Sequence, residues 1–358
     1  MAELLNKVRI GELFLSKGLI TQEQLEEALE YQKRYGGRLG WILASLGYIS
    51  RIDLFKTLAE HFGFEFIQDI ETLKKLIDPE FLAKFDPQEL AKFEVIPAKQ
   101  NKEEITILTS DPGSKRLYQF LEKHFPNMKY KFIVITDLDI IKLLESYFKE
   151  KFIDRAVHGL LQTSPEYSAS IVFSKGQVFV MGILLYLSLV WIYYDAVSYL
   201  TFLIFVVQVF YVASILFRLI LSLAGAKSEM QQFITDEDLK ALDEKDLPVY
   251  TVLVPVYKEP EVIGILINSL KKLDYPQSKL DVILLLEEDD KETYEAAKAH
   301  NPPVNWRFVI VPPSQPKTKP KACNYGLFFA KGKYLTIYDA EDIPEPDQLK
   351  KSVIAFQK

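Results

Sequence analysis

The sequence lacks several features that would place it in common classes of protein. Its 358 residues include one cysteine, Cys323, so no intramolecular disulfide can form, which suits a reducing compartment. The net charge of −6 shows no excess of basic residues and argues against a nucleic-acid-binding protein. No Gly-x-x-x-x-Gly-Lys-Ser/Thr motif is present, which excludes a P-loop ATPase. The first residues also lack the apolar stretch and small-residue cleavage site of a secretory signal peptide.

What the sequence does contain is a high share of hydrophobic residues, 49%, which excludes a disordered chain. Two stretches carry no charge, residues 176–194 and 196–217, with Asp195 between them. Each stretch is long enough to cross a bilayer as a helix, although a buried pair of core helices is the alternative. Lys175 and Arg218 flank the two stretches, and the positive-inside rule places both flanks in the cytoplasm. We therefore expect a transmembrane hairpin with its turn outside.

The N-terminal region repeats itself at an offset of 29 residues without a gap. Arg9 aligns with Arg38 and Gly11 with Gly40, and the later matches are Ser16 with Ser45, Gly18 with Gly47, Ile20 with Ile49, Leu25 with Leu54, and Leu29 with Leu58. Each unit places an arginine before a glycine at a predicted helix start, where backbone N–H groups and a guanidinium attract phosphate. Two equivalent half-sites suit a ligand with two equivalent halves. The alternative is a pair of helical hairpins that packs for structure alone.

This tandem pattern, from Arg9 to Gln32 and from Arg38 to His61, resembles the MshEN-type cyclic di-GMP-binding domain. The resemblance extends through an αβ segment to about Ser146. It departs from the family at His61, where a second Gln is expected. What the resemblance implies is a cyclic di-GMP site formed by Arg9, Gly11, Leu25, Leu29, Gln32, Arg38, Gly40, Leu54, Leu58 and His61.

The C-terminal region alternates apolar strand patterns with helix patterns, which predicts a mostly parallel α/β sheet with ligands at the carboxyl ends of its strands. The expected strands are 250–255, 280–286, 307–311 and 334–338, and the expected helices are 261–273 and 321–330. Acidic residues follow the strands, above all Asp339, Glu341 and Asp342. Such a cluster suits Mg²⁺ or Mn²⁺ completed by substrate phosphates, and Lys317, Lys319 and Lys321 add positive charge nearby. The alternative is an acidic surface turn.

The order of the motifs in this region resembles the processive, membrane-bound family 2 glycosyltransferases, the class of the cellulose synthases. The motifs are Pro255–Pro260, the acidic end of the second strand, Lys319 with Asn324, and Asp339–Pro346. The resemblance implies a nucleotide-sugar site of Tyr257, Glu259, Glu288, Asp290, Lys319 and Asp339. It also implies a metal site of Asp339, Glu341 and Asp342, with Glu341 where the family has a second Asp. The family's general base and acceptor motif would follow residue 358, so no catalytic residue is assigned and we expect a truncated chain.

The expected fold is an α/β multidomain membrane protein with a sensor, a transmembrane hairpin and a partial nucleotide-sugar-binding domain. The expected ranges are 1–146 for the sensor, 147–175 and 224–247 for linkers, 176–223 for the hairpin and 248–358 for the transferase domain. The expected function is inverting transfer from a UDP-sugar to a growing polysaccharide at the bacterial inner membrane. Cyclic di-GMP would regulate it from the cytoplasmic side. The alternative is a non-catalytic, membrane-anchored cyclic di-GMP receptor with a transferase remnant.

Overall fold

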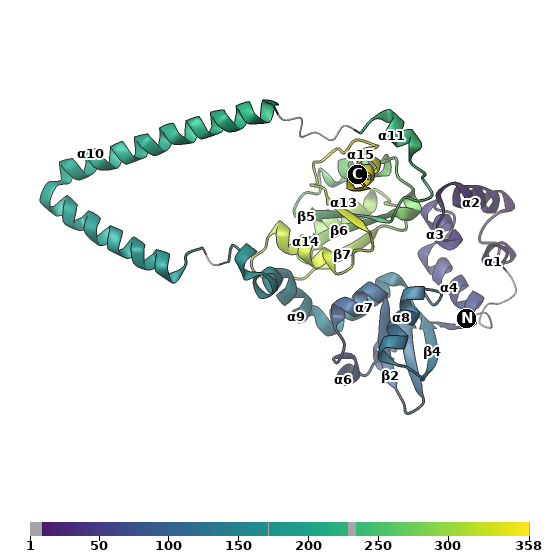
Figure 1. Ribbon diagram of the computed structural model, residues 1–358. Coiled ribbons are helices and arrows are strands. Elements are labelled where there is room, and N and C mark those ends of the chain that lie inside the picture. Colours follow the sequence, from purple (N-terminus) through teal and green to yellow (C-terminus); the bar gives the residue numbers. More distant parts are fainter. Residues whose placement is uncertain (1–8, 171, 228–233, 358) are drawn as a thin grey trace. The chain divides into compact units, whose positions relative to one another are not determined.

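The computed structural model describes residues 9–170, 172–227 and 234–357. The chain forms two compact units. The first unit combines the chain up to Gly159 with the chain from Asp236 onward, and the second comprises Leu160–Thr235. Within the first unit we call residues 9–159 the N-terminal half and residues 236–357 the C-terminal half. Figure 1 shows the elements of both units.

Four helices form the N-terminal repeat: α1 (Ile10–Ser16), α2 (Gln22–Tyr35), α3 (Leu39–Ser45) and α4 (Arg51–Phe62). Thr21 caps the start of α2 with a capping box, in which Gln24 N donates to Thr21 Oγ1 and Thr21 N donates to Gln24 Oε1. Ser50 caps α4 with the first of these two bonds, in which Asp53 N donates to Ser50 Oγ. Gly18 and Gly47 end the first helix of each unit with a positive φ, 65° and 79°. The two copies of the 29-residue repeat therefore share their turns as well as their sequence.

A four-stranded sheet follows the repeat, with strand order β1-β4-β3-β2. Its strands are β1 (Glu65–Phe66), β2 (Val95–Gln100), β3 (Glu104–Thr109) and β4 (Lys129–Val134). Strand β2 pairs antiparallel with β3, whereas the other two pairs are parallel. The accompanying helices are α5 (Ile70–Leu76), α6 (Pro79–Leu82), α7 (Pro87–Phe93), α8 (Lys115–His124) and α9 (Asp137–Thr163). This sheet completes the N-terminal half.

The C-terminal half is a second four-stranded sheet, and all of its strand pairs are parallel, as the sequence predicted. The order is β7-β6-β5-β8, with β5 (Tyr250–Val256), β6 (Leu280–Glu287), β7 (Arg307–Val311) and β8 (Tyr334–Ile337). Its helices are α11 (Asp236–Ala241), α12 (Ile263–Lys271), α13 (Lys291–Ala299), α14 (Lys319–Leu327) and α15 (Gln348–Gln357). Strands β5 and β6 are buried almost throughout, because parallel sheets are covered on both faces.

Helix α9 connects the two halves of the first unit. The Phe152 ring lies 4.9 Å from that of Phe328 and 5.6 Å from that of Phe329, and Asn324 Nδ2 donates to Ala156 O at 3.0 Å. Tyr325 of α14 is fully buried beside them. Residues 147–159, which the sequence led us to place in a linker, thus contribute side chains to the core of the first unit.

A charged contact also joins the halves. Arg51 of α4 binds Asp137 at 2.5 Å and donates to Trp306 O at 3.0 Å and to Val304 O. Burial alone would raise the pKa of Asp137, but the charges of Arg51, Lys331 and Arg307 outweigh it and hold that pKa well below its usual range. Asp137 is therefore a buried anion that depends on its cations.

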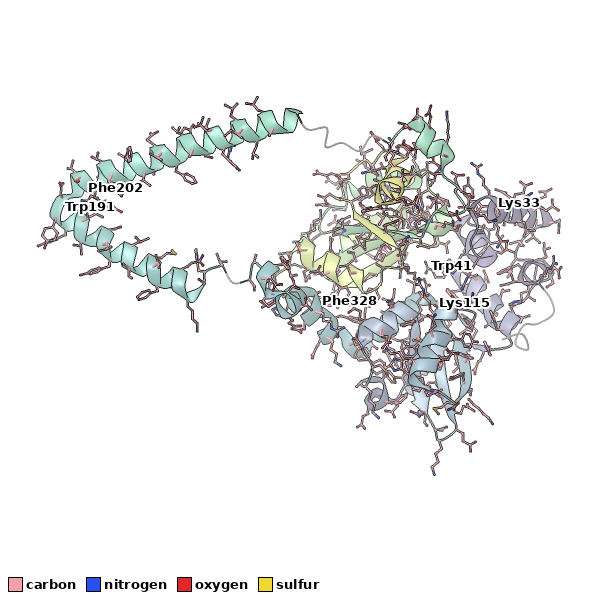
Figure 2. All side chains as sticks on the ribbon, in the orientation of Figure 1. Lys33, Trp41, Lys115, Trp191, Phe202 and Phe328 are labelled. Atoms are coloured by element: carbon pink, nitrogen blue, oxygen red, sulfur yellow. The ribbon has the colours of Figure 1, made fainter. Side chains whose placement is uncertain are left out.

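The second unit contains helix α10 (Lys175–Lys227), which is interrupted at Asp195, where φ is −156° and ψ is 89°. Trp191 stacks on Phe202 across this interruption, with ring centroids 5.1 Å apart, and Figure 2 shows the two side chains where the arms of the helix meet. Among the described residues, one segment, Lys175–Gly225, is long and apolar enough to cross a membrane. The expected pair of transmembrane helices is thus not confirmed, and membrane insertion stays a proposal.

Candidate functional site

The repeat builds its cavity from two equivalent helix crossings. Arg9 and Arg38 are the residues that precede α1 and α3, and each glycine two residues later faces a leucine of the next helix. A Cβ on Gly11 would lie 2.9 Å from Leu25 Cδ1, and a Cβ on Gly40 would lie 2.5 Å from Leu54 Cδ1. Real Cβ atoms essentially never approach so closely, so both positions favour glycine. The two helices of each unit can therefore pack closely enough to bring their half-sites together.

All ten residues expected at the cyclic di-GMP site line one cavity of about 580 Å³, which we call the N-terminal cavity. They are Arg9, Gly11, Leu25, Leu29, Gln32, Arg38, Gly40, Leu54, Leu58 and His61. Leucine side chains form apolar walls, and two arginines bring positive charge. The Gln32 amide donates to Gly37 O at 2.8 Å, which fixes its orientation. The cavity thus combines cationic and apolar surfaces of the kind that a phosphorylated ring system with flat bases requires.

The structure adds residues that the repeat could not reveal. Trp41, Phe55 and Phe62 come from α3 and α4, while Ser110 and Asp111 come from the loop after β3. The aromatic residues of the repeat could have been identified from the sequence as candidate cavity residues, because nucleotide bases stack on aromatic rings. The β3 loop carried no signal, because it lies outside the repeated segment.

The two arginines differ in their surroundings. Arg38 forms an ion pair with Asp111, whereas Arg9 is exposed and makes no ion pair within the described part of the chain. Burial raises the pKa of the Asp111 carboxyl, and the nearby positive charge of Arg38 opposes that rise. The half-sites are therefore equivalent in backbone but not in charge.

A second cavity of about 530 Å³, the C-terminal cavity, opens at the carboxyl ends of β5, β6 and β8. Of the residues expected there, five line it: Tyr257, Glu259, Lys319, Asp339 and Glu341. Lys317 and Thr318 line it too, in the loop before α14. This is the edge at which open parallel sheets bind ligands, and it is where the sequence analysis expected the nucleotide-sugar site.

Three expected residues do not line the C-terminal cavity. Glu288 forms an ion pair with Lys149 of α9 at 3.2 Å. Asp290 accepts hydrogen bonds from Lys258 N at 2.5 Å and from Thr293 N at 3.1 Å, so it caps α13. Asp342 accepts from Asp339 N at 2.7 Å and thereby closes the acidic turn. Each carboxylate has a structural partner that its sequence position did not disclose.

Lys317 joins two loops at the mouth of the C-terminal cavity. Its Nζ donates to Tyr257 Oη at 3.1 Å and to Asp289 Oδ2 at 2.6 Å, and it lies 4.3 Å from the centre of the Tyr257 ring. These hydrogen bonds raise the pKa of Lys317 and lower that of Asp289. Lys317 therefore stays charged and holds the Tyr257 ring in place.

The acidic turn fits a divalent cation only with help from a ligand. No group of three His, Cys, Asp or Glu side chains that could hold a metal is found among the described residues. Asp339 and Glu341 face the same cavity, and Lys319 forms an ion pair with Asp339. Mg²⁺ commonly takes one or two carboxylates and completes its shell with water and phosphate oxygens. The two carboxylates match that need, with the Lys319 ammonium as a competing partner.

Comparison with known proteins supports a two-part organisation. A family model described as MshEN domain matches residues 62–152, and one described as Glycosyl transferase family 2 matches residues 251–358. The tandem repeat lies almost entirely ahead of the first match.

Individual relatives agree with this division. The type IV pilus assembly ATPase PilB of Thermus thermophilus is 33% identical over 108 residues, which is 30% of this chain and 12% of that protein. The probable glycosyltransferase YdaM of Bacillus subtilis is 27% identical over 103 residues, which is 28% of this chain and 24% of that protein. The chain thus spans about an eighth and a quarter of the length of these two relatives.

Among solved structures, that of MshE with cdg covers 39% of this chain and 99% of its own, at 24% identity and a TM-score of 0.36. By the two family models, and not by this structural likeness, the chain combines an MshEN domain with a family 2 glycosyltransferase domain.

Proposed function

We propose that this protein is a membrane-bound family 2 glycosyltransferase that uses a UDP-sugar to extend a polysaccharide and is regulated by cyclic di-GMP. The observation that carries the proposal is the gathering of all ten residues expected at the cyclic di-GMP site around one cavity, on the same chain as the C-terminal cavity. Both cavities belong to the first compact unit, so binding of a ligand in one cavity can affect the other through the residues packed between them.

In the N-terminal cavity, Arg9 and Arg38 would each bind one half of the dinucleotide through a phosphate or a guanine edge. The leucine walls and Trp41 would contact the flat faces of the bases. Gly11 and Gly40 line the cavity and let the Leu25 and Leu54 side chains pack against the first turns of α1 and α3. Arg38 must leave Asp111 to bind, so its half-site is the weaker of the two.

In the C-terminal cavity, Tyr257 would stack on the donor's base while Lys317 keeps the ring in position. Lys319 would turn from Asp339 to the diphosphate, leaving the Asp339 and Glu341 carboxylates to hold Mg²⁺ or Mn²⁺. The cation, when bound, would neutralise charge on the departing nucleoside diphosphate. The general base for the acceptor hydroxyl is assigned to no residue of this chain.

Membrane attachment would run through α10, which we place in the bacterial inner membrane as a hairpin. The interruption at Asp195 divides it into two apolar arms, and Lys175 and Arg218 lie toward their outer ends. By the positive-inside rule, both ends and the two cavities would lie in the cytoplasm, where the donor and cyclic di-GMP are available.

A second candidate is a receptor without transferase activity. The observation that favours it is a pair of ion pairs, Glu288 with Lys149 and Asp339 with Lys319. Both carboxylates were expected to help bind the nucleotide sugar or its metal, and both already have a cationic partner.

One experiment separates the two candidates. The full chain, in lipid nanodiscs, is titrated with cyclic di-GMP and with UDP, the latter with Mn²⁺ or with a chelator. Binding of both ligands, with UDP requiring Mn²⁺, supports the enzyme. Binding of cyclic di-GMP alone supports the receptor. Absence of cyclic di-GMP binding would contradict both.

A further inference from the structure

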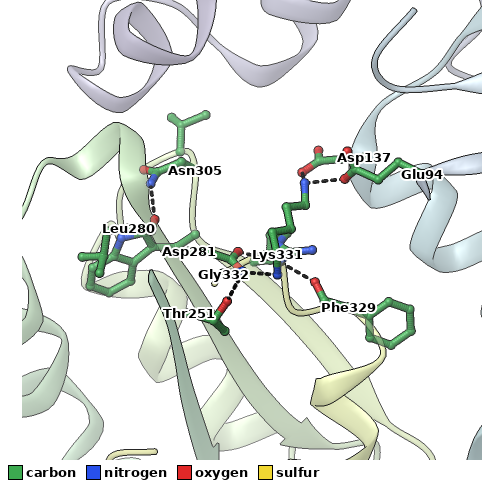
Figure 3. Close-up of polar contacts among 12 residues, drawn as sticks. Glu94, Asp137, Thr251, Leu280, Asp281, Asn305, Phe329, Lys331 and Gly332 are labelled. Atoms are coloured by element: carbon green, nitrogen blue, oxygen red, sulfur yellow. Dashed lines mark hydrogen bonds and ion pairs between the residues drawn. The ribbon is translucent and has the colours of Figure 1, made fainter. Parts of the chain in front are cut away.

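We propose that Asp111 and Lys331 transmit ligand binding from the N-terminal cavity to the loop that leads into β8 of the transferase domain. This inference rests on the proposed function and concerns the regulation of the same site. We call Arg38, Asp111, Lys331, Glu94 and Asp137 the relay. Its members come from both halves of the first unit, and Figure 3 shows the portion around Lys331.

The relay begins with a residue that cannot serve two partners. Arg38 lines the N-terminal cavity and is paired with Asp111, whose side chain is 23% exposed. A phosphate or guanine that recruits Arg38 must compete with that carboxylate. Because burial already disfavours the charged form of Asp111, losing Arg38 leaves an anion that needs another cation.

Lys331 lines a polar cavity together with Asp111, and its positive charge opposes the rise in the pKa of that carboxyl. Its ammonium pairs with Glu94 and lies 3.7 Å from Asp137, so two carboxylates already share it. Release of Asp111 presents a third carboxylate to the same lysine. The expected response is a shift of the Lys331 side chain toward Asp111.

The space for this shift exists. A polar cavity of about 210 Å³ is lined by all five members of the relay. Asn305 Oδ1, a buried polar atom in its lining, has no hydrogen-bond partner among the described residues. Polar cavities of this size with unsatisfied atoms hold water, so side chains in it can exchange partners without repacking the apolar core.

Movement of Lys331 would reach the transferase site through the backbone. Lys331 N donates to Asp281 Oδ2 at 3.0 Å, and Gly332 N donates to Thr251 Oγ1 at 2.8 Å, as Figure 3 shows. These bonds fix the entry to β8, and β8 leads directly to Asp339 and Glu341 in the C-terminal cavity. A change at Lys331 therefore acts on the strand that positions both carboxylates.

The first test compares cyclic di-GMP affinities of the full chain in nanodiscs by calorimetry. Asp111→Asn removes the competitor of Arg38, so we expect about two- to five-fold tighter binding, the range of a partly exposed ion pair. That gain should persist in an Arg9→Ala background and vanish in an Arg38→Ala background. Glu60→Gln is the matched control, because Glu60 is paired with Lys17 outside the cavity, and its affinity should equal that of the wild type.

The second test follows the loop by hydrogen exchange of the peptide that contains Lys331 and Gly332. Cyclic di-GMP should reduce the protection of this peptide in the wild type and in Glu60→Gln. The loss of protection should be absent in Asp111→Asn and in Lys331→Met, and the second variant keeps the test decisive if the first fails to fold.

The outcomes separate the inference from the proposed function. Failure of the wild type to bind cyclic di-GMP overturns the function. Binding by the wild type with unchanged affinity in Asp111→Asn, or with an unresponsive loop peptide, overturns the relay alone.

Discussion

Replacing Arg51 with alanine should weaken the junction between the two halves of the first unit more than any surface ion pair can. The Arg51 side chain is 11% exposed and that of Asp137 is 2% exposed. Without Arg51, the buried Asp137 carboxylate keeps one ion pair among the described residues, with Lys331 at 3.7 Å, and the more distant charge of Arg307. Removing one partner of a buried pair typically costs about 3–5 kcal/mol. For a unit of this size we expect the melting temperature to fall by about 6–15 °C.

The assay is thermal unfolding of the full chain in detergent, with Arg155→Ala as the matched control. Arg155 also pairs with an aspartate, Asp86, at 2.7 Å, but the two side chains are 39% and 43% exposed. That change should cost no more than about 1 kcal/mol. The same melting temperature for both variants would refute the claim that the Arg51–Asp137 ion pair stabilises the fold more than an exposed ion pair does.

The pH dependence gives an independent check. Because the folded state lowers the pKa of Asp137, the stability that Asp137 contributes is present above its unfolded pKa of about 3.9 and is lost as the pH falls below it. The difference between wild type and Arg51→Ala should therefore be largest at neutral pH and shrink in acid. If the difference in stability between wild type and Arg51→Ala did not change with pH, Asp137 would not contribute to the effect of the Arg51 substitution.

Three further predictions concern the two cavities and helix α9. Arg9→Ala and Arg38→Ala should each weaken cyclic di-GMP binding about ten- to hundred-fold in calorimetry, with the larger loss for Arg9, since Arg38 must first leave its carboxylate partner; unchanged binding in both would contradict the assignment. Asp339→Ala should abolish the Mn²⁺ dependence of UDP binding and leave cyclic di-GMP binding intact, and equal UDP titrations for variant and wild type would identify the acidic turn as mere surface. Burial raises the pKa of Glu145, whose carboxylate accepts from Tyr325 Oη at 3.0 Å, to about 7. The folded state therefore binds more protons, so stability should fall by up to about 3 kcal/mol as the pH rises from about 4.5 to 7. Glu145→Gln should melt above the wild type at pH 8 and together with it at pH 5, and identical pH profiles would contradict the raised pKa.

The sequence predicted the parts of the fold that repeat or that are buried without interruption. The offset of 29 residues located both halves of the N-terminal cavity, because equal spacing gives equal helix crossings. The apolar run at 280–286 predicted β6 (Leu280–Glu287) to within one residue, since a strand buried on both faces has a continuous apolar signal. Helix α13 was not expected, because its charged sequence lacks a strong apolar stripe.

Ion pairs between side chains that are far apart in the sequence could not be predicted from the sequence. Nothing near Arg38 indicates that Asp111 will meet it, and nothing near Glu288 indicates Lys149. Both pairs depend on how the sheet of the N-terminal half and helix α9 are placed in three dimensions. Local patterns specify which elements form, whereas ion pairs between remote elements arise only when those elements pack.

The first compact unit is built from two separate stretches of chain, and this has a topological consequence for α10. Whatever path the intervening residues take, they must leave and re-enter the same body, because Arg51 and Asp137 on one stretch touch residues of the other. A closed excursion can cross a bilayer only an even number of times. A single crossing would place the two halves of the first unit on opposite sides of the bilayer, where Phe152 and Phe328 could not pack against each other. If α10 enters a bilayer, parity rather than hydropathy therefore requires that the chain between the two stretches return to the side from which it left.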